Sequence, residues 1–228
     1  MRARNVALVV VLTAATLTVG LAQPAAVQVG LAGQVTTKTR DGASPATSVV
    51  YAEPIGGAAP RVRATTATMA QKNKSFAPRV MGIPVGTTVT FPNEDAIFHN
   101  AFSLSGPQPF DLGLYRGGAS KDRVFSQPSV YNVFCNIHPQ MVAFVVVAPT
   151  PWVTTTAADG AWRLDVPAGR YRVTAVSERA APVSVEVQVA GNATNPVRIT
   201  LDESAFVQAP RTDKFGKPYP ASAYKGGY

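Results

Sequence analysis

The sequence contains few of the residues that usually build reactive sites or cross-links. Its 228 residues include one cysteine and two histidines. One cysteine cannot form a disulfide within the chain, and it cannot supply the Cys-x-x-Cys-His motif that attaches haem. Charged residues make up only 15% of the chain, and no long stretch has helical periodicity. Glycine and proline are frequent, with 18 and 19 residues. This composition favours short strands joined by many turns, and therefore an all-β fold.

The first 22 residues have the features of a secretory signal peptide. Arg2 and Arg4 provide a positive start, residues 6–21 are largely apolar, and small residues lead to a cleavage site after Ala22. An uncleaved membrane anchor is the alternative, but the small residues and the Gln-Pro pair that follows favour cleavage. We therefore predict a mature chain without a membrane span, located in the periplasm or secreted.

The mature chain would remain basic. Removing residues 1–22 takes away two arginines and no acids, so the formal net charge falls from +8 to +6. A positive protein favours acidic partners or surfaces, although an ordinary solvated basic surface explains the same charge. Nucleic acid is not an expected partner, because the chain is predicted to be exported and its basic residues are scattered rather than interleaved with aromatic residues.

Turn signals divide the rest of the chain into two β-rich units and a tail. Residues 62–149 contain alternating strands and end in an apolar run, Met141–Val147, that suits a buried strand. Residues 150–202 contain an Asp-Gly turn and several alternating strands. Residues 203–228 are polar, with repeated glycine, proline and lysine. We predict that this last segment is an extended tail that lies over the surface or is disordered.

One stretch of seven residues gathers most of the soft donor groups. It holds Cys135, His138 and Met141, which are the only cysteine, one of two histidines and one of four methionines. Cys135 ends a predicted strand, His138 lies in the turn and Met141 begins the next strand, so their side chains can converge. His99 would join them from a separate strand end. A trigonal His₂Cys set with a weak axial methionine is the geometry of blue copper sites. The sequence therefore predicts one mononuclear copper ion bound by His99, Cys135, His138 and Met141.

Other chemistries fit the same residues less well. A structural zinc site usually needs four cysteine or histidine donors, and this chain offers three. A cysteine nucleophile activated by His138 would leave His99 and Met141 unexplained, and its thiol would be exposed to oxidation outside the cell. Multicopper oxidases and copper nitrite reductases need further histidines for a catalytic copper, and none remains here. We therefore predict that the protein is not an enzyme.

Residues 62–148 resemble the cupredoxin family, in particular its plastocyanin and amicyanin branch. The Cys-x-x-His-x-x-Met spacing from Cys135 to Met141 is similar to the amicyanin ligand loop, and Val85–Phe91 followed by His99-Asn100 is similar to that family's strand and first ligand. The sequence also resembles bacterial proteins labelled methylamine-utilisation-like.

This resemblance implies a Greek-key β-sandwich with one type 1 copper. His138 would be the ligand that faces solvent, surrounded by an apolar patch for which Pro139 and Phe102 are the candidates. Asn100 would bond to the backbone near Cys135 and hold the two ligand segments together. Its alternative role is that of an ordinary turn asparagine.

The part after Pro149 resembles carboxypeptidase regulatory-like β-sandwich domains. Residues 159–162, Asp-Gly-Ala-Trp, and residues 166–171, Val-Pro-Ala-Gly-Arg-Tyr, carry this likeness. The opening strands of that family are missing after Pro149, but residues 33–51 supply something similar. We therefore predict a second small β-sandwich made discontinuously from residues 31–60 and 150–202.

Taken together, these features predict a periplasmic one-electron carrier. A redox partner would dock near His138, and the basic charge of the chain favours an acidic one. A copper chaperone or storage protein, or a subunit that delivers electrons within a larger complex, remains the alternative.

Overall fold

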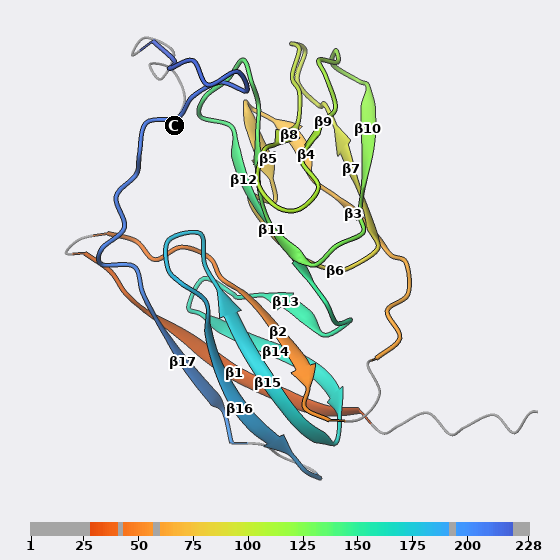
Figure 1. The fold of residues 1–228 in the computed structure, drawn as a ribbon, viewed down its shortest axis with the longest axis vertical. Helices are drawn as coiled ribbons and strands as arrows, with labels where there is room; N and C mark the ends of the chain where they lie inside the picture. Colours follow the sequence, from red (N-terminus) through yellow and green to blue (C-terminus); the bar gives the residue numbers. More distant parts are fainter. Residues whose placement is uncertain (1–27, 41–42, 57–59, 192–194, 221–228) are drawn as a thin grey trace, which may run out of the picture.

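The computed structural model describes residues 28–40, 43–56, 60–191 and 195–220. The predicted signal peptide, residues 1–22, therefore lies outside the described part of the chain. Within these ranges every regular element is a strand, so none of the described residues forms a helix that could span a membrane. The predicted all-β fold class is confirmed, and the strands form two sandwiches, one above the other in Figure 1.

The middle of the chain forms the upper sandwich. One sheet has the strand order β10-β7-β3, the other has the order β6-β12-β11-β8-β9, and β4 and β5 form a small hairpin. The strand bounds are β3 (Thr66–Thr68), β4 (Ala70–Lys72), β5 (Ser75–Ala77), β6 (Val80–Pro84), β7 (Thr87–Pro92), β8 (Phe102–Ser103), β9 (Phe110–Asp111), β10 (Ser120–Phe125), β11 (Ser129–Phe134) and β12 (Val142–Ala148).

Burial along these strands follows the hydrophobic pattern. In β7, Thr87, Val89 and Phe91 are buried and the residues between them are half-buried, as expected for a strand with one face on the core. In β12 every residue from Ala143 to Ala148 is buried. Ala143, Val145 and Val147 belong to the upper core, whereas Phe144 and Val146 point to a second apolar cluster on the opposite face. The uninterrupted apolar run is therefore a strand that is covered on both sides.

The lower sandwich combines strands from both ends of the described chain. Its sheets have the orders β14-β1-β17 and β13-β2-β15-β16. The strand bounds are β1 (Gln28–Lys38), β2 (Val49–Pro54), β13 (Val153–Thr155), β14 (Ala161–Pro167), β15 (Gly169–Val176), β16 (Val183–Val189) and β17 (Val197–Asp202).

The pairing of β1 and β2 determines how the two sandwiches are connected. β1 lies between β14, to which it is antiparallel, and β17, to which it is parallel. β2 lies between β13 and β15. Both N-terminal strands thus pair with strands that follow residue 150. On this basis we propose that residues 31–60 and 150–202 form one discontinuous unit, into which residues 62–149 are inserted.

An apolar interface joins the two sandwiches. Its buried side chains come from β6 and β12 above and from β2 and the end of β15 below, and they are Val49, Val80, Phe144, Val146 and Val176. At the edge of this interface Arg79 donates two hydrogen bonds, of 2.8 and 2.7 Å, to the carboxylate of Glu178. The upper sandwich is therefore held to the lower one by packing as well as by the chain.

Replacing Gly33 by alanine tests the position of β1. A Cβ at Gly33 would lie 2.1 Å from the backbone oxygen of Val197 in β17, so the two strands would have to separate. We expect the Gly33→Ala variant to lose about 2 kcal/mol of unfolding free energy, the usual cost of overpacking. Urea unfolding followed by tryptophan fluorescence would measure this, because Trp152 and Trp162, the only two tryptophans, both pack in the lower core.

Gly30→Ala is the matched control in the same strand. The atoms nearest to a Cβ there belong to the guanidinium of Arg163, whose side chain is 68% exposed and can shift with little cost although it pairs with Asp165. Its unfolding free energy should stay within about 0.5 kcal/mol of the parent value. Equal losses in the two variants would contradict the close approach of β1 to β17.

Candidate metal centre

Two connections meet at the upper end of the upper sandwich. Residues 93–101 join β7 to β8, and residues 135–141 join β11 to β12. In the sheet, Phe134 at the end of β11 lies opposite both Phe102 of β8 and Val142 of β12. This register brings the residues just beyond these strand ends together, which is where the predicted ligands lie.

The structure brings His99, Cys135 and His138 together. One potential ligand atom from each residue lies within 4.8 Å of the others. The two Nδ1 atoms of His99 and His138 are 3.0 Å apart, and Sγ of Cys135 is 3.7 Å from Nδ1 of His138. His99 and Cys135 are fully buried, whereas His138 is only partly buried. Two imidazole nitrogens and one sulfur therefore converge, with one imidazole near the surface.

Met141 lies in the same tight loop. Its amide donates to the backbone oxygen of His138 at 3.0 Å, and its own backbone oxygen accepts from the amide of Cys135 at 3.2 Å. The Met141 side chain is fully buried and belongs to the same apolar cluster as Cys135. The loop is thus closed by its own backbone, with the thioether on the buried side. That this sulfur serves as an axial ligand stays a prediction.

Asp95 holds the second nitrogen of His99. Nε2 of His99 lies 2.7 Å from a carboxylate oxygen of Asp95. The carboxylate also accepts the amides of Asn73 at 2.7 Å and Lys74 at 2.9 Å. Both residues have a φ of +53°, which is uncommon for side-chain-bearing residues, and this turn directs their amides to Asp95. A carboxylate behind a ligand histidine fixes the orientation of the ring, so Nδ1 of His99 stays directed at His138.

The electrostatics of these groups suit a metal site. Burial by itself would raise the pKa of Asp95, but the hydrogen bonds from Lys74, His99 and Asn73 outweigh it, and the pKa lies below its ordinary value. Burial lowers the pKa of His138, and the nearby His99 and Lys74 lower it further. The two shifts favour an ionised carboxylate and a neutral imidazole, which are the forms that a metal centre requires.

Asn100 connects the two ligand segments. Its Oδ1 accepts the amide of Asn136 at 2.7 Å, and its Nδ2 donates to Asp111 at 3.3 Å. The side chain is buried, with an exposed fraction of 1%. Because Asn100 follows His99 and Asn136 follows Cys135, this hydrogen bond sets the distance between the two backbones that carry the ligands.

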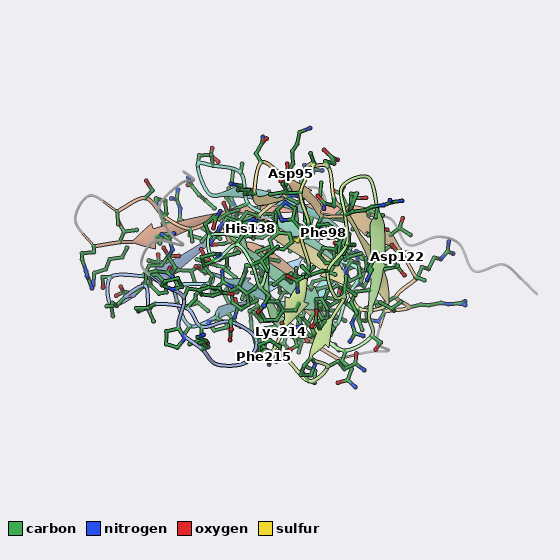
Figure 2. All side chains as sticks on the ribbon, turned by 90° about the horizontal axis from the view of Figure 1, so that it is seen from above. Asp95, Phe98, Asp122, His138, Lys214 and Phe215 are labelled. Atoms are coloured by element: carbon green, nitrogen blue, oxygen red, sulfur yellow. The ribbon has the colours of Figure 1, made fainter. Side chains whose placement is uncertain are left out.

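The expected surface patch is made of other residues. Pro139 and Phe102 were the candidates, and this expectation is wrong because both are buried. Phe102 packs against Phe134 beneath the ligand loop. The exposed apolar side chains next to ligands in the sequence are Phe98 and Ile137, with exposed fractions of 56% and 44%. Figure 2, which looks down on this end, shows Phe98 and His138 near the middle of the face.

Asp95 was not predicted as a functional residue. It lies in the Pro-Asn-Glu-Asp turn four residues before His99, and this spacing was the one signal that could have identified it. Its role depends on the turn at Asn73 and Lys74, which approaches from a distant part of the chain. Sequence spacing alone could not have shown that contact.

Asp95→Asn tests the support of His99. We expect the affinity for copper to fall roughly 10- to 100-fold, because the ring loses its charged partner while the ligands remain. Competition with a copper chelator would measure it. Glu94→Gln is the matched control, since Glu94 is exposed and pairs with Lys72 at the surface. An Asp95→Asn variant with the affinity of the control would contradict this role.

Comparisons with known proteins give partial matches. No protein-family model and no curated protein matches the chain. Among solved structures, it is similar to a Cu-containing nitrite reductase from Thermus scotoductus (32% identity over 42% of this chain, TM-score 0.36), of which it spans only 25%. It is similar to a purple cupredoxin from Nitrosopumilus maritimus (31% identity over 36% of this chain and 99% of that chain, TM-score 0.34). It is also similar to a reduced amicyanin mutant (23% identity over 36% of this chain and 80% of that chain, TM-score 0.34).

Proposed function

We propose that the protein is a one-electron carrier with a single type 1 copper ion. The ligands would be Nδ1 of His99, Sγ of Cys135 and Nδ1 of His138, with the thioether of Met141 as a weak axial donor. The observation that carries this proposal is the convergence of two imidazole nitrogens and one thiol sulfur within 4.8 Å at a largely buried end of a β-sandwich. This donor set is the one that blue copper sites use.

The chemistry of the donors fits copper better than other metals. A thiol sulfur and two imidazoles suit copper in both oxidation states, and a long axial thioether tunes the potential. Among the described residues the cluster has three cysteine or histidine donors, fewer than the four that a structural zinc site takes. When bound, copper would supply a reversible one-electron couple. The protein would then accept one electron from a donor protein and pass it to an acceptor protein.

The residues around the ligands would keep their positions constant during this change. Asp95 fixes the ring of His99, and Asn100 fixes the distance between the two ligand segments. The loop that carries Cys135 and His138 is closed by its own backbone hydrogen bonds. Complete burial of His99 and Cys135 excludes water from two of the donors. Because these contacts hold the ligands in place, the site would rearrange little when the metal gains or loses an electron. A small rearrangement favours rapid electron transfer.

A redox partner would dock at the face around His138. That side chain is only partly buried, and Ile97, Phe98 and Ile137 are exposed beside the ligand segments. A cleft of about 810 Å³ next to Asp95 and Ile97 includes Lys74 in its wall. An apolar face with basic residues at its edge suits an acidic partner, and the positive net charge supports this. We place this exchange in the periplasm or outside the cell.

Cys135→Ser tests the copper ligand. The parent protein with copper should show an intense thiolate-to-copper absorption band toward the red end of the visible spectrum. It should also be reduced and reoxidised reversibly by one electron. The variant should keep its fold, by circular dichroism, and lose the band. A parent protein that binds only Cu(I) and stays colourless would refute the carrier and favour a copper chaperone or store.

Met141→Leu tests the axial position. Leucine keeps the volume but removes the sulfur that would stabilise Cu(II), so we expect the colour to remain and the reduction potential to rise. Voltammetry of the copper protein would measure the change. Met81→Leu, a buried methionine in β6 of the same core, is the control and should leave the potential unchanged. Equal potentials in the two variants would exclude Met141 as a ligand.

A further inference from the structure

The chain after the lower sandwich returns to the upper sandwich and forms a small turn there. After β17 the backbone rises along one side of the molecule to the ligand end (Figure 1). Thr212 and Pro218 form an isolated β-bridge. Between them the carboxylate of Asp213 accepts the amides of Phe215 at 2.9 Å and Lys217 at 2.8 Å. These bonds give the described end of the predicted tail a defined shape. We call residues 211–219 the clamp.

The clamp contacts the loop that carries Cys135 and His138. The amide of Lys214 donates to Oδ1 of Asn136 at 2.8 Å, and the hydroxyl of Tyr219 donates to the backbone oxygen of Asn136 at 2.8 Å. Nη1 of Arg211 donates to the backbone oxygen of Pro139 and, at 3.3 Å, to that of Met141. These contacts reach backbone oxygens at three points of a loop of seven residues.

Arg211 also packs on the strand that leads into the loop. Its guanidinium lies 3.9 Å from the centre of the Phe134 ring, the residue immediately before Cys135. A guanidinium over an aromatic ring gains a cation–π attraction that increases when the group is shielded from water. The Arg211 side chain therefore contacts both ends of the ligand loop. It packs on the Phe134 ring just before the loop, and it donates a hydrogen bond to Met141 at the end of the loop.

The clamp completes a closed ring of hydrogen bonds next to the site. Oδ1 of Asn136 accepts from Lys214, and the amide of Asn136 donates to Oδ1 of Asn100 at 2.7 Å. Nδ2 of Asn100 donates to one oxygen of Asp111 at 3.3 Å, and the other oxygen pairs with Nζ of Lys214. The ring thus connects the clamp to both ligand segments, because Asn100 follows His99 and Asn136 follows Cys135.

The other end of the connecting segment is anchored as well. Glu203, just after β17, is 4% exposed, and its carboxylate accepts the amide of Ala46 at 3.1 Å and the hydroxyl of Ser177. Phe206 lies beneath the guanidinium of Arg179. The segment is therefore held on the lower sandwich at one end and on the ligand loop at the other.

We propose that the clamp is a positioning device for the metal centre, supplied by the part of the chain that follows the lower sandwich. Arg211 and Tyr219 act through the backbone oxygens of the loop, and the amide of Lys214 acts through the side chain of Asn136. Their effect on copper rests on the function proposed above. Their effect on the conformation of the loop does not depend on that function, because the contacts join protein groups and need no copper.

The first test uses the copper-free protein. We compare the full chain with a chain that ends at Pro210, and measure amide hydrogen exchange of residues 136–138 and 140–141. Loss of the clamp removes several hydrogen bonds from this loop, so we expect exchange roughly tenfold faster or more there. Exchange in β14 and β15 of the lower sandwich should not change, which would show that the shortened chain is folded. Unchanged exchange in the loop would overturn the clamp.

Point variants separate the clamp from general destabilisation. Arg211→Gln and Tyr219→Phe each remove contacts with the loop and leave the rest of the chain intact. Lys217→Gln is the matched control, because it removes a positive charge from an exposed side chain of the same turn. Faster loop exchange in the first two variants and not in the control supports the clamp. The same change in all three, or in none, overturns it.

The second test uses the copper-loaded protein. In the Arg211→Gln and Tyr219→Phe variants, transfer of copper to a chelator should be several-fold to tenfold faster and the reduction potential should shift, with no change in the Lys217→Gln control. If loop exchange increases but no variant and no parent protein binds copper, the clamp stands and the proposed function fails. If copper binds and both readouts match the control, the function stands and the clamp is refuted.

Discussion

The hydrogen bond between Asn100 and the amide of Asn136 is the contact on which the candidate site depends. The donors come from two separate connections, and neither connection alone can bring a sulfur and two imidazoles together. A single bond of 2.7 Å fixes the spacing of the two backbones, and Phe134, which pairs with both Phe102 and Val142, fixes their register. Asp95 then sets the ring of His99. The side chains converge because the backbone has been placed first.

The two sandwiches contribute differently to this arrangement. The upper sandwich carries the candidate ligands, whereas the lower one forms a base against which it packs, and the chain returns from there to the end that holds the candidate site. β12 shows how closely the two are joined, since its residues alternate between the upper core and the interface below. This strand begins directly after Met141. The packing between the sandwiches therefore restrains the last residue of the ligand loop.

Local patterns made much of this predictable. The all-β class followed from composition and turn signals, and the meeting of Cys135 with His138 followed from their spacing in one hairpin loop. That His99 joins them rested on there being no other histidine. The rest depends on contacts that no local pattern records. Asp95 is organised by a turn some twenty residues earlier in the chain, and a polar segment rich in glycine, proline and lysine gives no sign that it will bind Asn136. The expectation that Pro139 lies in an exposed patch is wrong, because its burial depends on which other segments of the chain cover the loop.

The position of β1 has a consequence for how the chain acquires its structure. Thr36 of β1 bonds to Thr200 of β17, 164 residues later. Sheet β14-β1-β17 therefore cannot close until nearly the whole chain is available. Contacts between residues so far apart in the sequence form slowly. The upper sandwich has no such restriction, because all its strands lie between Thr66 and Ala148. Once it folds, it brings the segments near residues 54 and 153 together, so that Tyr51 can pair with Val153 as if the intervening chain were a short connection. Folding of the upper sandwich and closure of its base thus belong to different stages in the maturation of the polypeptide, and the clamp can reach the ligand loop only in the later one.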